Sequence, residues 1–134
     1  MLRPAVPADL RCLAAIRDAS GADALSDPAL VADAELRRLV GAGAVAVWEE
    51  DGEIAGFGAA DSAAIHLLVA AGARGKGVGR ILLADCCARL KQAGYATATL
   101  SLGAGGTAAR HYRAAGWTEA GRSPAGGVVL QKPL

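Results

Sequence analysis

Apolar residues near the start of the chain recur with helical spacing. Residues 9–20 carry one such pattern, which we expect Asp9 to cap. Residues 28–40 carry a second, with Ser26 or Asp27 as its cap and a proline at its first position. The sequence therefore predicts two consecutive helices in its first third.

Shorter apolar runs precede and follow these helices and have the character of strands. We expect strands at residues 2–6, 44–48, 54–60 and 63–69. The Asp-Gly pair at positions 51–52 is a hairpin signal, and the pair Asp61-Ser62 marks another tight turn. These strands are expected to form an antiparallel meander.

The second half begins with one strand–helix–strand crossover. Residues 65–69 form a buried apolar run, a helical pattern covers residues 78–92, and residues 96–102 return as a strand. Such a connection joins parallel strands with a right-handed twist. After it, we expect Thr107 to cap a short helix ending near residue 115. Two final strands are expected at residues 117–120 and 128–132.

Together these elements predict one α+β domain spanning residues 1–134. Its sheet should be twisted, mixed and mostly antiparallel, with six or seven strands and about four helices. A hydrophobic content of 53% with 20% charged residues indicates a chain that folds into a globular core.

Composition also bears on location and partners. No apolar run is long enough to span a membrane, and the N-terminus lacks a cleavable signal pattern, so we expect a cytoplasmic protein without a membrane partner. The three cysteines, Cys12, Cys86 and Cys87, lack the spacing of a metal site, and we expect them to be reduced thiols and no metal to be bound.

Charge is divided unequally along the chain. Residues 1–61 carry a net charge of −6, and residues 62–134 carry +7. A basic half suits an anionic cofactor, and an acidic half could suit a cationic acceptor, although both could equally be solvated surface. Nucleic acid is a less favoured partner, because the bases gather around one short loop and aromatic residues make up only 4% of the chain.

The loop between the buried strand and the crossover helix is the strongest candidate for a binding site. Glycines alternate with basic residues there, in the order Arg74, Gly75, Lys76, Gly77, Val78, Gly79, Arg80. At a helix start, free N–H groups and the helix dipole favour phosphate, and glycine lets the ligand approach the backbone closely. Two common nucleotide patterns fail: Ala70 and Gly77 break the Walker pattern, and Arg80 replaces the third glycine of the dinucleotide fingerprint.

One known pattern does fit. Arg-Gly-Lys-Gly-Val-Gly at 74–79, read as Q/R-x-x-G-x-G/A, resembles the acyl-CoA signature of the GNAT superfamily of N-acetyltransferases. The segment at 112–117, Tyr-Arg-Ala-Ala-Gly-Trp, is similar to a second block of that family. The resemblance is good over residues 43–121 and loose before them.

The resemblance implies a set of binding residues. The pyrophosphate of coenzyme A would lie on the loop from Arg74 to Arg80. The pantetheine arm would run between the central strand and the strand after the crossover, which separate from one another, and would bond the backbone near Leu68 and Val69. Acetyl-CoA would be the co-substrate, an amine the acceptor, and a homodimer is consistent with the family.

Two residues are candidates for proton transfer. Tyr112 matches the family tyrosine that protonates the departing thiolate, and its unperturbed pKa lies above that of a thiol. His66 is a polar residue in an apolar strand, where alternation turns it away from Ile65 and Leu67. It is either the base that deprotonates the amine or a histidine satisfied by its surroundings; ordered water is the other candidate base.

We therefore expect an enzyme that moves an acetyl group from acetyl-CoA to an amine of a small molecule or peptide by direct attack. Two alternatives stay open: a non-catalytic acyl-CoA-binding or sensing module, and a toxin-like aminoacyl-tRNA acetyltransferase. Gly105, where the family often has asparagine, and the lack of a carboxylate on the central strand motivate the first alternative.

Overall fold

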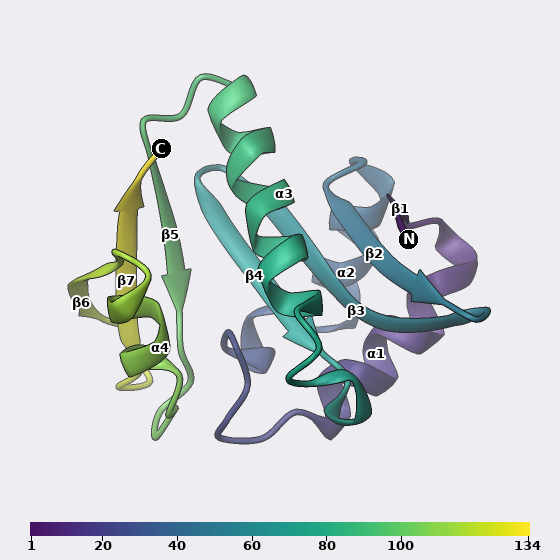
Figure 1. Cartoon of the computed structure of the whole chain (residues 1–134), viewed down its shortest axis with the longest axis horizontal. Coiled ribbons are helices and arrows are strands. Elements are labelled where there is room, and N and C mark those ends of the chain that lie inside the picture. Colours follow the sequence, from purple (N-terminus) through teal and green to yellow (C-terminus); the bar gives the residue numbers. More distant parts are fainter.

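The computed structural model describes residues 1–134 and contains one mixed sheet covered on both faces by helices (Figure 1). The strands are β1 (Leu2–Pro4), β2 (Val45–Glu50), β3 (Glu53–Asp61), β4 (Ala64–Val69), β5 (Thr97–Ser101), β6 (Thr118–Arg122) and β7 (Val128–Pro133). The α-helices are α1 (Leu10–Ala19), α2 (Asp33–Gly41), α3 (Val78–Gln92) and α4 (Ala109–Ala114). Three short 3₁₀ turns complete the chain: η1 (Pro7–Asp9), η2 (Pro28–Leu30) and η3 (Ala71–Ala73).

The sheet has seven strands in the order β1-β2-β3-β4-β5-β7-β6. Every neighbouring pair is antiparallel except β4 and β5, which α3 connects as a parallel crossover. The predicted α+β class, the mostly antiparallel mixed sheet and the number of elements are therefore confirmed. No helix is long and apolar enough to cross a membrane.

Two hydrophobic cores lie on opposite faces of the sheet. The first packs α3 and α4 against β4, β5 and β7, and it contains Leu82, Cys86 and Tyr112. The second packs α1 and α2 against β2, β3 and β4, and it contains Leu13, Leu39 and Phe57. Figure 1 shows α3 across the near face, with α1 and α2 behind the sheet. Successive side chains of β4 contribute to alternate cores, as strand geometry requires.

The parallel pair separates along its length. β4 and β5 are paired only at Ala64 with Thr99 and at Ile65 with Leu100. Beyond Ile65, the two strands diverge toward the end of β4 from which the loop to α3 departs (Figure 1). The backbone on that side of β4 must find other hydrogen-bond partners, because buried N–H and C=O groups are rarely left unpaired.

Three local expectations differ from the structure. The predicted second helix is divided: Asp27 caps the turn η2 by accepting from the Ala29 N–H, and Val31 leaves helical geometry before α2 begins. Asp9 does not cap α1. Its carboxylate instead accepts from the Val6 N–H and pairs with Arg3, and makes no capping bond to α1.

Thr107 is the third difference. Its hydroxyl donates to the Ala22 carbonyl at 3.4 Å, and its amide donates to the same oxygen, so α4 begins without a side-chain cap. The partner lies 85 residues away in the sequence, and local capping rules could not have indicated it.

Close packing between β3 and α3 gives a test of the fold. A Cβ added at Gly58 would lie 2.8 Å from the sulfur of Cys86, which is fully buried. We predict that Gly58→Ala lowers the free energy of unfolding by about 1–3 kcal/mol through overpacking. Urea denaturation of purified protein measures this change.

Gly41→Ala is the matched control, because no atom lies within 4 Å of a Cβ at that position at the end of α2. It should leave stability unchanged or raise it by roughly 0.5–1 kcal/mol. Equal stability of the two variants would contradict the packing of β3 against α3.

Candidate functional site

The loop from β4 to α3 presents a run of unbonded amides. Gly75 and Gly77 have φ values of 76° and 84°, a left-handed conformation that glycine adopts without strain, and Gly77 is the N-cap of α3. The amides from Gly75 through Arg80 donate to no carbonyl or side chain of the protein. Six consecutive donors at the positive end of a helix of 15 residues form a strong site for an anion.

Side chains leave this loop open. A Cβ at Gly72, Gly75 or Gly77 would meet nothing within 4 Å, so the backbone faces free space. Gly79 is different, because a Cβ there would lie 2.8 Å from a methyl group of Leu25. The loop can therefore receive a ligand from outside, and Leu25 forms the wall on its inner side.

A cavity of about 400 Å³ continues inward from the loop. Its lining combines the glycine loop, apolar side chains from β4 and α3, and part of α4. The residues are Asp23, Leu25, Leu67, Val69, Ala73, Arg74, Gly75, Gly77, Val78, Gly79, Arg80, Leu83, His111, Tyr112 and Ala115. Arg74 comes from the loop, Arg80 from the first turn of α3, and Tyr112 from α4.

Most predicted site residues therefore line one cavity, but three do not. Lys76 is exposed on the loop outside it. The side chain of Leu68 is fully buried in the α1/α2 core, and its carbonyl oxygen lies toward Gly56 of β3. His66 also lies away from the cavity.

The position of Leu68 shifts the expected backbone contacts by one residue. In a strand, successive residues direct their N–H and C=O groups to opposite sides. Ala70 bonds β3, whereas both polar groups of Leu67 bond Ser26 on the side of β5. By this alternation Leu67 and Val69 face the gap between β4 and β5, and Leu68 faces β3.

Tyr112 is held firmly in the cavity wall. It is 1% exposed, and its ring makes an edge contact with Trp117 at 5.7 Å between centroids. Gly116, at φ 96°, turns the chain so that the two rings meet, which explains the spacing of the second sequence block. Burial raises the pKa of the phenol well above its usual 10, so the hydroxyl stays protonated at neutral pH. That hydroxyl donates to the Leu25 carbonyl at 2.6 Å.

His66 lies on the other face of the sheet from Tyr112, as alternation along β4 predicted. It is half-buried, and its charged neighbours are Glu35 and Arg38 of α2, Asp61 of β3, and Asp27. Arg38 pairs with Glu35 and Asp61. Burial lowers the pKa of His66 below its usual 6.5, while the three carboxylates oppose that shift. The structure does not bring His66 and Tyr112 together.

Residues 22–27, which we call the strap, cross the gap between β4 and β5 and were not predicted from the sequence. Ser26 bonds Leu67 of β4, and the amide of Asp27 donates to the Ser101 carbonyl of β5 at 2.7 Å. Only the polar residues near Pro28 indicated an ordered segment, and they suggested a helix cap.

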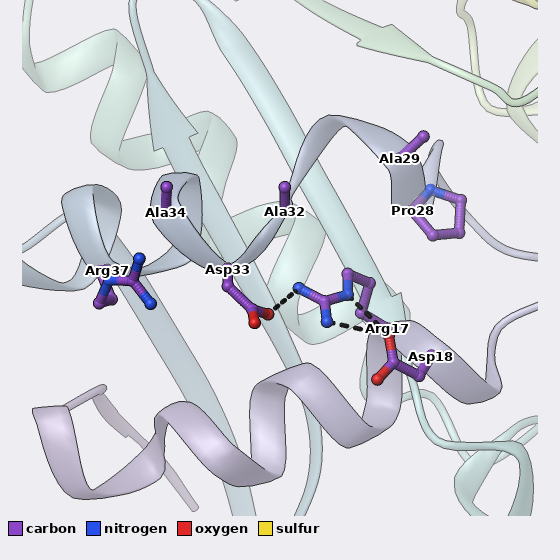
Figure 2. Close-up of a pocket in the computed structure, with 8 residues that line it drawn as sticks. All are labelled: Arg17, Asp18, Pro28, Ala29, Ala32, Asp33, Ala34 and Arg37. Atoms are coloured by element: carbon purple, nitrogen blue, oxygen red, sulfur yellow. Dashed lines mark hydrogen bonds and ion pairs between the residues drawn. The ribbon is translucent and has the colours of Figure 1, made fainter.

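A second hollow, larger but wide open, lies between the end of α1 and the start of α2 (Figure 2). Arg17 crosses it and pairs with Asp18 and Asp33, and it also donates to the Val31 carbonyl. These contacts hold α1 to α2, and they pair Arg17, Asp18 and Asp33 with one another rather than leaving them free for a ligand. The candidate functional site is therefore the glycine loop and the cavity behind it.

Comparison with known proteins agrees with this geometry. A model of the acetyltransferase (GNAT) domain family matches residues 18–127. A search of curated proteins found no match.

Solved structures share the whole fold. A ribosomal-protein-alanine N-acetyltransferase from Brucella melitensis is 25% identical, with a TM-score of 0.76, over 100% of this chain and 99% of its own. Rv2747 from Mycobacterium tuberculosis, solved with CoA and NLQ, is 14% identical, with a TM-score of 0.79 and the same coverage. A phosphinothricin acetyltransferase from Sinorhizobium meliloti, solved with AcCoA, is 23% identical, with a TM-score of 0.75, over 100% of this chain and 88% of its own.

The family match covers most of the chain and includes the glycine loop, the separated strands and Tyr112. The chain belongs to the GNAT acetyltransferase family and forms a GNAT-type N-acetyltransferase domain.

Proposed function

We propose that this protein transfers the acetyl group of acetyl-CoA to the amine of a small molecule or peptide, with the cofactor held in the cavity behind the glycine loop. The observation that carries this proposal is the run of six unbonded amides, from Gly75 to Arg80, at the mouth of a cavity that contains Tyr112. Relatives of the same fold were solved with CoA or AcCoA, which supports the choice of ligand.

The residues present fit such a ligand. Free amides and two arginines suit a diphosphate, and the open glycines allow it to approach the backbone. Leu67, Val69 and Leu83 give the inner cavity an apolar lining suited to an arm of low charge. Acetyl-CoA supplies a thioester that is already activated, so the protein has to position the reactants and manage protons.

Tyr112 is proposed as the proton donor to the leaving thiolate. Tyr112 lines the cavity, and its raised pKa keeps the phenol protonated, and so able to donate, at neutral pH. The hydroxyl proton is bonded to the Leu25 carbonyl, so that bond must break before transfer.

His66 is proposed as the base that accepts the proton of the amine. Burial keeps its imidazole unprotonated at neutral pH, a state in which it can accept a proton. Its place on the α1/α2 face separates it from Tyr112, which suits an acceptor that enters from the face opposite the proton donor.

A binding module without turnover is the second candidate function. One observation favours it: the hydroxyl of Tyr112 donates its proton to the Leu25 carbonyl, so that proton is not free for a leaving thiolate. Release of free thiol from acetyl-CoA in the presence of amines distinguishes the two, because a binder would show affinity for the ligand but no release.

Binding of acetyl-CoA is the first test. We predict that a saturating concentration raises the melting temperature of the protein, because the ligand binds only the folded state. Arg80→Ala should weaken affinity by about 1–2 kcal/mol, or roughly 5- to 30-fold, as an exposed phosphate partner is lost. Lys76→Ala is the control, since Lys76 carries the same charge on the same loop but lies outside the cavity. No stabilisation by acetyl-CoA would contradict the proposed ligand.

Turnover tests the role of Tyr112. We predict that Tyr112→Phe lowers the rate of thiol release by roughly 100- to 10,000-fold, the usual contribution of a general acid, without weakening acetyl-CoA binding. Tyr95→Phe is the matched control, because Tyr95 is exposed and follows α3 away from the cavity. If Tyr112→Phe keeps the rate of the unaltered enzyme, Tyr112 is not the proton donor.

The lowered pKa of His66 predicts a pH dependence of stability. Because the folded state binds this proton less tightly than the unfolded chain, stability is full above pH 6.5 and falls as pH drops through the folded pKa. Each unit of lowering corresponds to about 1.4 kcal/mol. Urea denaturation at pH 7.5 and at pH 5, each about 1 unit or more from the ordinary histidine pKa, measures this change. The free energy of unfolding should fall less between these two pH values in His66→Gln than in the unaltered protein. An identical loss in both proteins would refute the shift.

A further inference from the structure

The strap, residues 22–27, takes the place of a strand where β4 and β5 separate. The hydroxyl of Ser26 donates to the Leu67 carbonyl at 3.0 Å and accepts from the Leu67 amide at 2.8 Å. On the other side, the Asp27 amide donates to Ser101 of β5. Ser26 is 1% exposed, so these bonds are closed off from solvent. In Figure 1 the connection from α1 toward α2 runs below the gap between β4 and β5.

Side chains of the strap alternate between the two faces of the sheet. Ala24 belongs to the core beneath α1 and α2, whereas Leu25 packs against the core beneath α3. The strap consequently separates two cavities. Asp23 and Leu25 line the cavity of about 400 Å³ behind the glycine loop, and Ala24 and Ser26 line another of about 390 Å³.

Three parts of the proposed cofactor site are bonded to the strap. Arg74 forms an ion pair with Asp23, and this pairing lowers the pKa of the carboxyl. The hydroxyl of Tyr112 donates to the Leu25 carbonyl. The polar backbone groups of Leu67 are both taken by Ser26. The strap thus occupies three groups that the ligand would need: the Arg74 guanidinium, the Tyr112 hydroxyl and the backbone of Leu67.

We propose that the strap is a closing segment that fills the gap between β4 and β5, and that Ser26 is its latch. Its hydroxyl offers Leu67 one donor and one acceptor, the same pair of groups that an amide in the arm of an acyl-CoA would offer. Loading of the ligand then requires Ser26 to leave Leu67, which frees Tyr112 from Leu25 and Arg74 from Asp23 in the same movement. This inference rests on the proposed function, because it takes coenzyme A as the ligand.

The latch has a thermodynamic consequence for affinity. Ligand binding that must first open a closed state is weakened by the free energy of opening. Ser26→Ala leaves two buried polar groups of Leu67 without partners in the closed state, which raises the free energy of that state. The ligand-bound state does not carry this cost, since the ligand bonds the same groups. We expect Ser26→Ala to bind coenzyme A roughly 3- to 30-fold more tightly than the unaltered protein.

Isothermal titration of the full chain with coenzyme A measures this change. Ser123→Ala is the matched control: the hydroxyl of Ser123 also bonds the backbone, at the Gly127 amide, but in the loop between β6 and β7. It should bind coenzyme A with unaltered affinity. Unchanged or weaker binding by Ser26→Ala would overturn the latch.

Hydrogen exchange on the unaltered protein gives a second test that does not depend on the folding of a variant. Coenzyme A should speed exchange of the Asp27 amide, which is bonded to Ser101 only while the strap is closed. Slower or unchanged exchange at Asp27 on binding would overturn the proposal. If the unaltered protein binds no coenzyme A at all, the proposed function fails, whereas binding without strap release overturns the latch alone.

Discussion

β4 and β5 are parallel strands that pair at one end and separate at the other. Only two residue pairs join them, after which the backbone of β4 turns Leu67 and Val69 toward a gap. Buried polar backbone groups must be satisfied, so this gap has to be filled by another part of the chain or by a ligand with amides of its own. The arrangement of the site follows from that requirement.

The same separation creates the anion site. β4 must leave the sheet to begin the crossover, and positive φ values at Gly75 and Gly77 turn the chain into α3 with six amides unbonded. Helix dipole, free donors and Arg80 act together at one point, and the apolar cavity begins immediately behind them. In the proposed complex, the charged part of the ligand would bind at the surface and its uncharged part would enter the gap between the strands.

Sequence alone predicted the elements that local pattern determines. The crossover helix, the alternation that separates His66 from Leu67, and the glycine loop all depend on spacing within a few residues, and the structure agrees with each. What it could not predict depends on distant partners. The pattern predicts Ser26 or Asp27 as a helix cap, because nothing near Ser26 in the sequence indicates Leu67, 41 residues away. Likewise the bond between Tyr112 and Leu25 joins residues 87 positions apart.

The most direct test is a crystal structure of the protein with coenzyme A. The account predicts density for the diphosphate on the amides between Gly75 and Arg80, with the arm of the ligand lying between β4 and β5 and bonded to the backbone of Leu67 and Val69. A diphosphate bound elsewhere, or an arm that stays outside the gap, would contradict it.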